Sequence, residues 1–162
     1  SFGTTSLRMT DNDIPIRISV SNTTTDTLEG DSGDKDFTFQ VQLDAAPFTT
    51  PVTVRYATQI GTAGTDDFTE VSDTLTFDMG ETTKTITVQV KGDAQFEPDE
   101  TFTVVLSDAS ENARISEGTA IATITNDDTA PIVTITGAES IAEGDTGSQD
   151  YTFTVSLNEA SS

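Results

Sequence analysis

The chain of 162 residues contains no cysteine, no histidine and no tryptophan, and its 7 lysines and arginines face 28 aspartates and glutamates. Without cysteine and histidine there is no disulfide framework, no Ser-His-Asp or Cys-His nucleophile and no zinc site of the usual kind. The formal net charge of −21 disfavours nucleic acid and anionic membranes as partners, because binding to either begins with cationic side chains. Carboxylate oxygen is abundant, and it suits hard cations such as calcium.

Long hydrophobic runs are also absent. Hydrophobic residues make up 33% of the chain, and no stretch approaches the roughly 20 apolar residues of a membrane-spanning helix. We therefore expect no direct insertion into a membrane. The opening SFGTTSLRMTDND lacks the charged and apolar regions of a secretory signal peptide, so this segment predicts no such signal.

An internal repeat of about 115 residues organises the chain. The segment that starts at Pro15 returns at Pro131, and the segment that starts at Gly3 returns at Gly118. A Glu-Gly-Asp tripeptide occurs once in each copy of the longer segment. Self-similarity at a fixed period is typical of repeat proteins. The predicted parts are the C-terminal end of a preceding repeat in residues 1–13, a complete repeat in residues 14–128, and the N-terminal strands of the next repeat in residues 129–162.

Apolar and polar residues alternate in seven short segments of the complete repeat, a pattern typical of β-strands. The segments are 16–20, 37–43, 52–56, 75–77, 86–90, 102–106 and 120–124. No window carries a 3.6-residue apolar stripe, so no helix is expected to cover a sheet. Strands without helices bury apolar surface by packing sheet on sheet. The sequence therefore predicts an all-β fold, an immunoglobulin-like seven-stranded antiparallel β-sandwich, with tandem repeats joined end to end.

The topology of such a sandwich separates the acids into two groups, because successive antiparallel strands place alternate loops at the same end. Fourteen acids fall near the end where the last strand leaves: Glu29, Asp31, Asp34, Asp36, Asp66, Asp67, Glu70, Asp73, Asp93, Glu97, Asp99, Glu100, Asp127 and Asp128. Only six fall near the other end: Asp44, Asp78, Glu81, Asp108, Glu111 and Glu117. Two like charges about 4 Å apart repel by about 4 kcal/mol at an effective dielectric of about 20. This asymmetry favours bound cations over the alternative of a generally acidic, solvated surface.

Several motifs in the complete repeat resemble those of the Calx-beta domain. They are EGD at 29–31, GTAGTDDF at 61–68, LTFDMGETTKTITVQV at 75–90, GDAQFEPDETFTVVLS at 92–107 and TITNDD at 123–128. The resemblance covers essentially the whole repeat. It implies a calcium-associated β-sandwich of a kind known from the regulatory loop of sodium/calcium exchangers, from an integrin subunit's cytoplasmic tail, and from arrays in large bacterial surface or secreted proteins.

The resemblance also implies which residues would bind Ca²⁺. Carried over position by position, the ligands are Glu29, Asp66, Asp93, Glu97, Glu100, Asp127 and Asp128. Asn126 stands where exchanger domains of the family begin an unbroken acidic run. Because Asn offers a carbonyl oxygen without charge, we expect fewer ions or weaker affinity than in those domains.

Apparent catalytic motifs carry little weight in this chain. Gly30-Asp31-Ser32-Gly33 matches the tetrapeptide around the nucleophile of trypsin-like proteases, yet a chain without histidine has no base to activate Ser32. Glu97 and Glu100 could form a glycosidase pair, but a sugar cleft needs aromatic walls and tryptophan is absent. We therefore expect no enzymatic activity.

The expected function is that of a calcium-binding structural repeat in a large extracellular protein such as an adhesin, surface fibre or filament. The linkers around Pro15 and Pro131 are short, so calcium at the acidic end would rigidify the joints between repeats. Expected partners are neighbouring repeats of the same chain, with self-association into fibres, outside or on the surface of a bacterial cell. The alternatives are a calcium-sensing regulatory domain of a membrane or cell-surface protein, and a strand edge that binds protein or glycan.

Overall fold

The computed structural model describes residues 14–137, 140, 142, 144–148 and 150–158. Residues 1–13, which the sequence assigns to a preceding repeat, lie outside this set. The described residues form ten strands and no helix, so none of their elements is a helix that could cross a membrane. The strands are β1 (Ile16–Asn22), β2 (Gly33–Leu43), β3 (Val52–Ile60), β4 (Ser72–Phe77), β5 (Thr83–Gly92), β6 (Glu100–Ser107), β7 (Ala113–Glu117), β8 (Thr119–Ile124), β9 (Val133–Gly137) and β10 (Phe153–Leu157).

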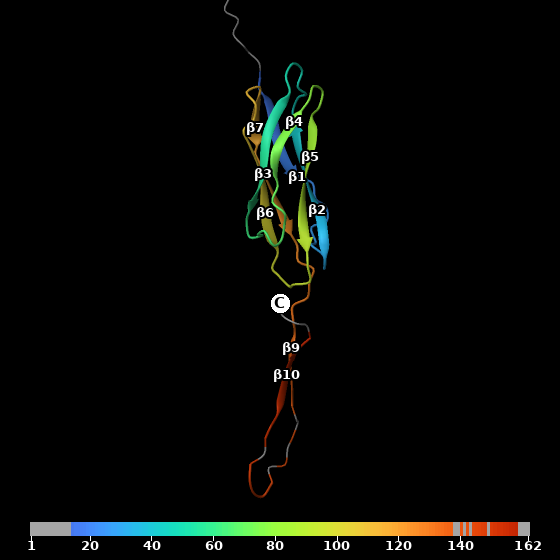
Figure 1. Cartoon of the computed structure of the whole chain (residues 1–162), viewed down its shortest axis with the longest axis vertical. Helices are drawn as coiled ribbons and strands as arrows, with labels where there is room; N and C mark the ends of the chain where they lie inside the picture. Colours follow the sequence, from blue (N-terminus) through green and yellow to red (C-terminus); the bar gives the residue numbers. More distant parts are fainter. Residues whose placement is uncertain (1–13, 138–139, 141, 143, 149, 159–162) are drawn as a thin grey trace, which may run out of the picture.

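Two four-stranded sheets make up the sandwich, with strand orders β5-β2-β1-β7 and β4-β3-β6-β8 (Figure 1). Every pair within them is antiparallel except β1 with β7, which is parallel. The strands β9 and β10 form a separate antiparallel hairpin beyond one end of the sandwich. The predicted all-β, immunoglobulin-like sandwich is confirmed.

The final strand of the sandwich is divided at Gly118. Its first part, β7, pairs with β1 in one sheet, and its second part, β8, pairs with β6 in the other. The alternation in the sequence predicted β8 but missed β7, where only Ala113 and Ile115 pack against the core. A Cβ at position 118 would come within 3.0 Å of the Ile115 side chain, so the crossing between sheets favours glycine.

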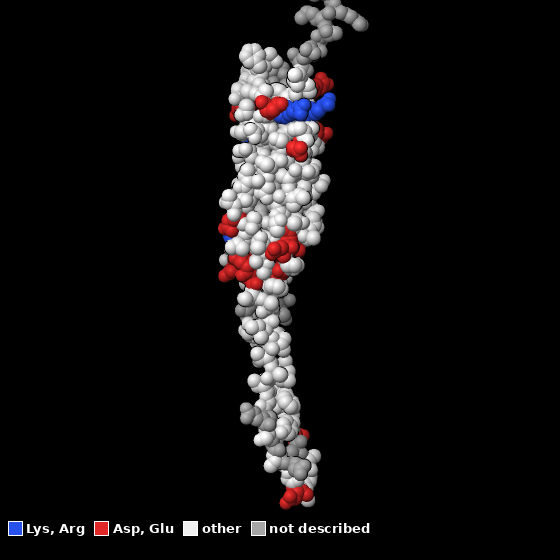
Figure 2. All heavy atoms as spheres, turned by 180° about the vertical axis from the view of Figure 1, so that it is seen from behind, with Lys and Arg blue, Asp and Glu red and all other residues white. Residues whose placement is uncertain are grey.

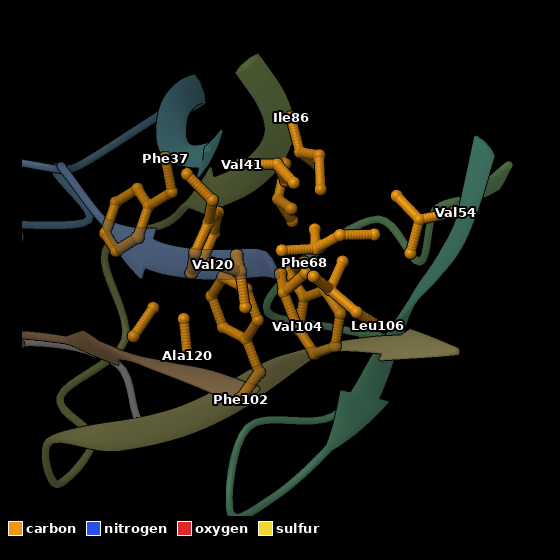
Figure 3. Close-up of a cluster of buried hydrophobic side chains, with 14 of the residues drawn as sticks. Val20, Phe37, Val41, Val54, Phe68, Ile86, Phe102, Val104, Leu106 and Ala120 are labelled. Atoms are coloured by element: carbon orange, nitrogen blue, oxygen red, sulfur yellow. The ribbon is translucent and has the colours of Figure 1, made fainter. Parts of the chain in front are cut away.

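The core consists of the inward-facing residues of both sheets, as the period-two pattern predicted, and Phe102 lies at its centre (Figure 3). The Phe102 ring stacks on Phe68 with centroids 4.5 Å apart and also contacts Phe37 and Phe39. Phe68 belongs to the loop between β3 and β4, so this stacking anchors the loop to the core. Phe68 thereby fixes the aspartates that immediately precede it.

The hairpin of β9 and β10 has the same cross-strand register as β1 and β2. Ile18 faces Leu43 in the sandwich, and Val133 faces Leu157 in the hairpin. Ile18 is fully buried, whereas Val133 is 67% exposed. The apolar side chains of the hairpin are therefore uncovered within the described part of the chain.

Candidate metal centre

Charged side chains gather at the two ends of the sandwich. On the face drawn in Figure 2, Asp and Glu side chains form groups at both ends and leave the middle of the sandwich uncharged. The chain continues toward β9 from one of these ends. We call this end the exit end. It consists of the β1–β2, β3–β4 and β5–β6 loops and the residues after β8.

Strand pairing brings distant acids together at the exit end. The parallel bridge between Leu28 and Thr125 places Glu29 beside the residues that follow β8, and the backbone N–H of Glu29 donates to the carbonyl of Thr125 at 3.1 Å. The bridge between Phe68 and Val90 places the β3–β4 loop beside the end of β5. Four segments of the sequence therefore meet around one volume, as the topology predicted.

Glu29 is the centre of the first carboxylate group. Its side chain is only 5% exposed, although it is ionisable and faces other acids. The pKa of Glu29 is raised from 4.5 to about 7, chiefly by burial and then by the charges of Asp93, Asp128, Glu97 and Asp127. These five residues are all among the predicted ligands, and in the absence of a cation they repel one another.

Glu100 is the centre of a second group, which adjoins the first. One ligand oxygen from each of Asp67, Glu97 and Glu100 lies within 4.8 Å of the others. Burial raises the pKa of Glu100 to about 7, assisted by a hydrogen bond with the Asp67 side chain and by the charges of Asp67 and Glu97. Glu97 acts on both Glu29 and Glu100, so it joins the two groups.

Asp66 is the predicted ligand that the structure does not bring into either group. Its side chain is exposed, whereas its neighbour Asp67 is half-buried and joins Glu97 and Glu100. Asp67 is oriented by the backbone N–H of Gly64, which donates to its carboxylate at 2.6 Å. The sequence analysis did not include Asp67 among the predicted ligands. Gly64, three positions earlier, is the feature of the sequence that could have pointed to Asp67, because its backbone N–H holds the carboxylate. The ligand set itself stays a prediction.

Asn126 connects the loops that carry the acids. Its side-chain oxygen accepts the backbone N–H of Glu97 at 3.0 Å, and its side-chain nitrogen donates to the carbonyl of Asp128 at 3.0 Å. The backbone N–H of Gly30 donates to the Asp127 carboxylate at 2.9 Å, which ties the chain exit to the β1–β2 loop. The sequence suggested Asn126 as a weakened ligand, and the structure gives it a positioning role.

The lysines and arginines with ion pairs among the described residues pair with acids outside the two groups. The lysines nearest the exit end donate to backbone carbonyls, Lys35 to Leu28 at 2.8 Å and Lys91 to Thr65 at 2.6 Å. The ion pairs among the described residues join Lys35 to Asp26, Arg55 to Asp108 and Lys84 to Glu81. None of these three pairs includes Glu29, Glu97 or Glu100.

The donor atoms fit calcium. Calcium binds oxygen at 2.3–2.6 Å, so two ligand oxygens on one ion are separated by at most about 5 Å. The oxygens of Asp67, Glu97 and Glu100 meet this limit, since all lie within 4.8 Å of one another. A divalent cation would also remove the repulsion that raises the pKa values of Glu29 and Glu100.

Known proteins of one family match this chain in sequence and in fold. A sequence model of the family described as the Calx-beta domain matches residues 11–128. The crystal structure of the apo form of the Calx CBD1 domain is 25% identical with a TM-score of 0.57, over 71% of this chain and 100% of that one.

Two further structures contain longer chains. CBD12 from CALX1.2 is 27% identical with a TM-score of 0.59, over 69% of this chain and 46% of that one. The calcium binding domain CBD12 of CALX1.1 is 26% identical with a TM-score of 0.58, over 71% and 45% respectively. No curated protein sequence matches.

Proposed function

The chain belongs to the Calx-beta family of calcium-binding domains, and from this premise we propose that it is a structural module of a large extracellular or cell-surface protein whose joints calcium makes rigid. The observation that carries the proposal is the position of the two carboxylate groups at the exit end. Asp127 and Asp128 belong to the first group and are also the last residues before the linker. A cation there would bind the sandwich and the departing chain together.

The linker is short enough for this effect to reach the next segment. Only residues 129–132 separate Asp128 from β9, and Pro131 restricts the backbone of this linker. With Asp127 and Asp128 held by calcium to Glu29 on the β1–β2 loop, the linker would start from a fixed position. Without calcium, repulsion within the group would push the exit away from that loop.

Burial of Glu29, together with the charges around it, sets the magnitude of this switch. The rise in the pKa of Glu29 from 4.5 to about 7 corresponds to about 3 kcal/mol of unfavourable free energy when the group is ionised. Extracellular calcium modules typically bind at about 0.1–1 mM calcium. The joint would therefore be rigid outside cells and loose inside, as suits an exported protein without disulfides.

The arrangement of the chain supports neighbouring repeats as partners. The β9–β10 hairpin shares the register of β1 and β2 and exposes Val133, Ile135 and Val155, which further strands of a following repeat would cover. The proposed division is a preceding repeat's end in residues 1–13, a complete repeat in 14–128 and the start of the next in 129–162. Where such strands stay uncovered, they favour association between chains into fibres.

A calcium-sensing regulatory domain is the second candidate. The similarity to Calx CBD1 and CBD12 structures favours it, since one of them is described as a calcium binding domain of CALX1.1. In that role, calcium would change the conformation of an attached transporter or receptor. We propose no enzymatic activity and no nucleic-acid or membrane-inserting role for either candidate.

The structural role is tested by measuring the joint directly. Spin labels at Thr85 on β5 and Thr134 on β9, each introduced as cysteine into the cysteine-free chain, report the distance between sandwich and hairpin. We expect a broad distance distribution in chelator and a narrow one in millimolar calcium, but not in equal magnesium. Glu97→Gln should abolish the narrowing, whereas Glu111→Gln, an exposed acid at the other end, should preserve it. Equal distributions with and without calcium would refute the rigid-joint function.

A further inference from the structure

Two arginines lie side by side at the end of the sandwich opposite the exit end. Arg17 on β1 and Arg114 on β7 are register partners in the parallel pair of these strands. The next residues, Ile18 and Ile115, pack in the core, so both arginines lie on the outer face of the sheet. Both side chains are exposed. We call this end, where the chain enters the sandwich, the entry end.

The arginines line a cavity at the point of entry. Its volume is about 510 Å³, and its walls are formed by Ile14, Pro15, Arg17, Arg114 and Ser116. Two arginines, a serine and two apolar residues therefore line one volume. Guanidinium groups bind carboxylates through paired hydrogen bonds, so this lining fits a carboxylate ligand.

Neither arginine forms an ion pair with another described residue. Arg55 and Lys84, at the same end, pair with Asp108 at 3.8 Å and Glu81 at 2.9 Å. The Asp44 carboxylate near Arg17 accepts the backbone N–H of Arg17 at 2.8 Å. Two neighbouring like charges that form no ion pair repel each other, and an anion between them would reduce this repulsion.

The apolar residues of the entry end favour a protein as the source of the carboxylate. Ile14, which lines the cavity, is exposed, and Phe48 and Met79 are exposed in the β2–β3 and β4–β5 loops of the same end. Aromatic residues, methionine and arginine are the residue types enriched in protein interfaces. An inorganic anion or a small acid would use only the guanidinium groups and would leave these apolar side chains uncovered.

We propose that the Arg17–Arg114 cavity is a carboxylate-binding site for the acidic exit end of a second copy of this domain, placed ahead of Ile14 in the same chain. The proposal rests on the head-to-tail arrangement of the proposed function. The residues just before Ile14 read Thr-Asp-Asn-Asp, and they correspond to Thr125–Asp128 at the repeat distance of 115 residues. An acidic exit end therefore precedes this cavity in sequence.

The site also distinguishes one joint from another. In the register that the two hairpins share, Val133 corresponds to Ile18, so Ile132 stands in the place of Arg17. Alignment of Pro131 with Pro15 would place Val133 there instead, which is likewise not an arginine. The entry formed by the β9–β10 hairpin thus lacks the first arginine. The arginine pair would set the contact at the joint ahead of Ile14, and the joint after Asp128 would depend on other contacts.

The test is a nuclear magnetic resonance titration of the 162-residue chain in chelator, with Asp11→Asn and Asp13→Asn so that its own acids do not compete. The probe is the end-capped peptide Thr-Ile-Thr-Asn-Asp-Asp, the sequence of residues 123–128. We expect shifts confined to residues 14–17 and 113–116. Binding should be at least about tenfold weaker for the peptide with both aspartates replaced by asparagine.

Matched variants and a small anion complete the test. Arg17→Gln and Arg114→Gln should each weaken binding of the peptide at least about fivefold, while Arg55→Gln leaves it unchanged. Equal binding of the Asn peptide, shifts at other residues, or equal shifts with acetate alone would each overturn the assignment. Because calcium is absent throughout, failure here would leave the calcium-dependent joint untouched, and failure of that joint would not alter this result.

Discussion

Replacing Glu29 by glutamine should have opposite effects on stability in chelator and in calcium. The pKa of Glu29 is raised from 4.5 to about 7 in the folded chain, chiefly by burial and then by four neighbouring acids. A raised carboxyl pKa means that the folded state holds its proton more tightly than the unfolded state. Stability from this group is therefore present below about pH 4.5 and is lost as the pH rises to about 7.

The magnitude follows from the size of the shift. Each pH unit of separation between the two pKa values corresponds to about 1.4 kcal/mol, so ionised Glu29 costs the folded state about 3 kcal/mol above pH 7. Glutamine has nearly the same shape and carries no charge. In chelator at pH 8, Glu29→Gln should raise the free energy of unfolding by up to about 3 kcal/mol, and at pH 4.5 the gain should nearly vanish.

Calcium should reverse the sign. A cation would make ionised Glu29 favourable, so the variant should gain less stability from calcium than the original chain does. Urea unfolding at pH 4.5 and pH 8, with chelator or with 10 mM calcium, gives the four free energies that decide this. Glu111→Gln, an exposed acid at the entry end, is the control and should change none of them by more than about 0.5 kcal/mol. A Glu29→Gln chain that is destabilised in chelator at pH 8 would refute the reasoning.

Three further changes test the surroundings of the site. Asn126→Ala removes the side-chain hydrogen bonds to the backbone N–H of Glu97 and the carbonyl of Asp128. It should lower the free energy of unfolding in urea by about 1–3 kcal/mol and weaken calcium binding. Unchanged calcium binding would contradict the positioning role of Asn126. Phe68→Ala should cost about 3–5 kcal/mol, because it removes a fully buried ring, and a loss below about 1 kcal/mol in the same assay would contradict this. Gly92→Ala should lower the melting temperature strongly, since its Cβ would overlap the carbonyl oxygen of Gly30, and a change of less than about 2 °C would show that the loops separate easily.

The sequence predicted the strands with strong alternation and the ends at which their loops lie. It missed β7, because an exposed edge strand of five residues buries too little apolar surface to leave a pattern. The arginine pair was missed as a consequence. Arg17 and Arg114 become neighbours only through the parallel pairing of β1 with β7, and β7 was not predicted.

The site was predictable as a cluster but not in its detail. Topology places the acids at the exit end, yet only the folded structure separates exposed Asp66 from half-buried Asp67. Burial of Glu29 likewise depends on the bridge between Leu28 and Thr125, which joins segments nearly 100 residues apart in the chain. Such contacts depend on how the loops close over the ends of the strands, and local patterns do not record this.

The central claim, that the exit end binds calcium through the two carboxylate groups, is tested most directly by the melting temperature of the 162-residue chain at pH 7.5. If the dissociation constant is about 0.1 mM, 10 mM calcium adds about 2.7 kcal/mol and should raise the melting temperature by roughly 5–10 °C over the same ionic strength of sodium chloride. Magnesium should give much less, and Glu97→Gln should remove most of the calcium effect. A calcium shift no larger than that of sodium, or one that survives undiminished in Glu97→Gln, would contradict the account.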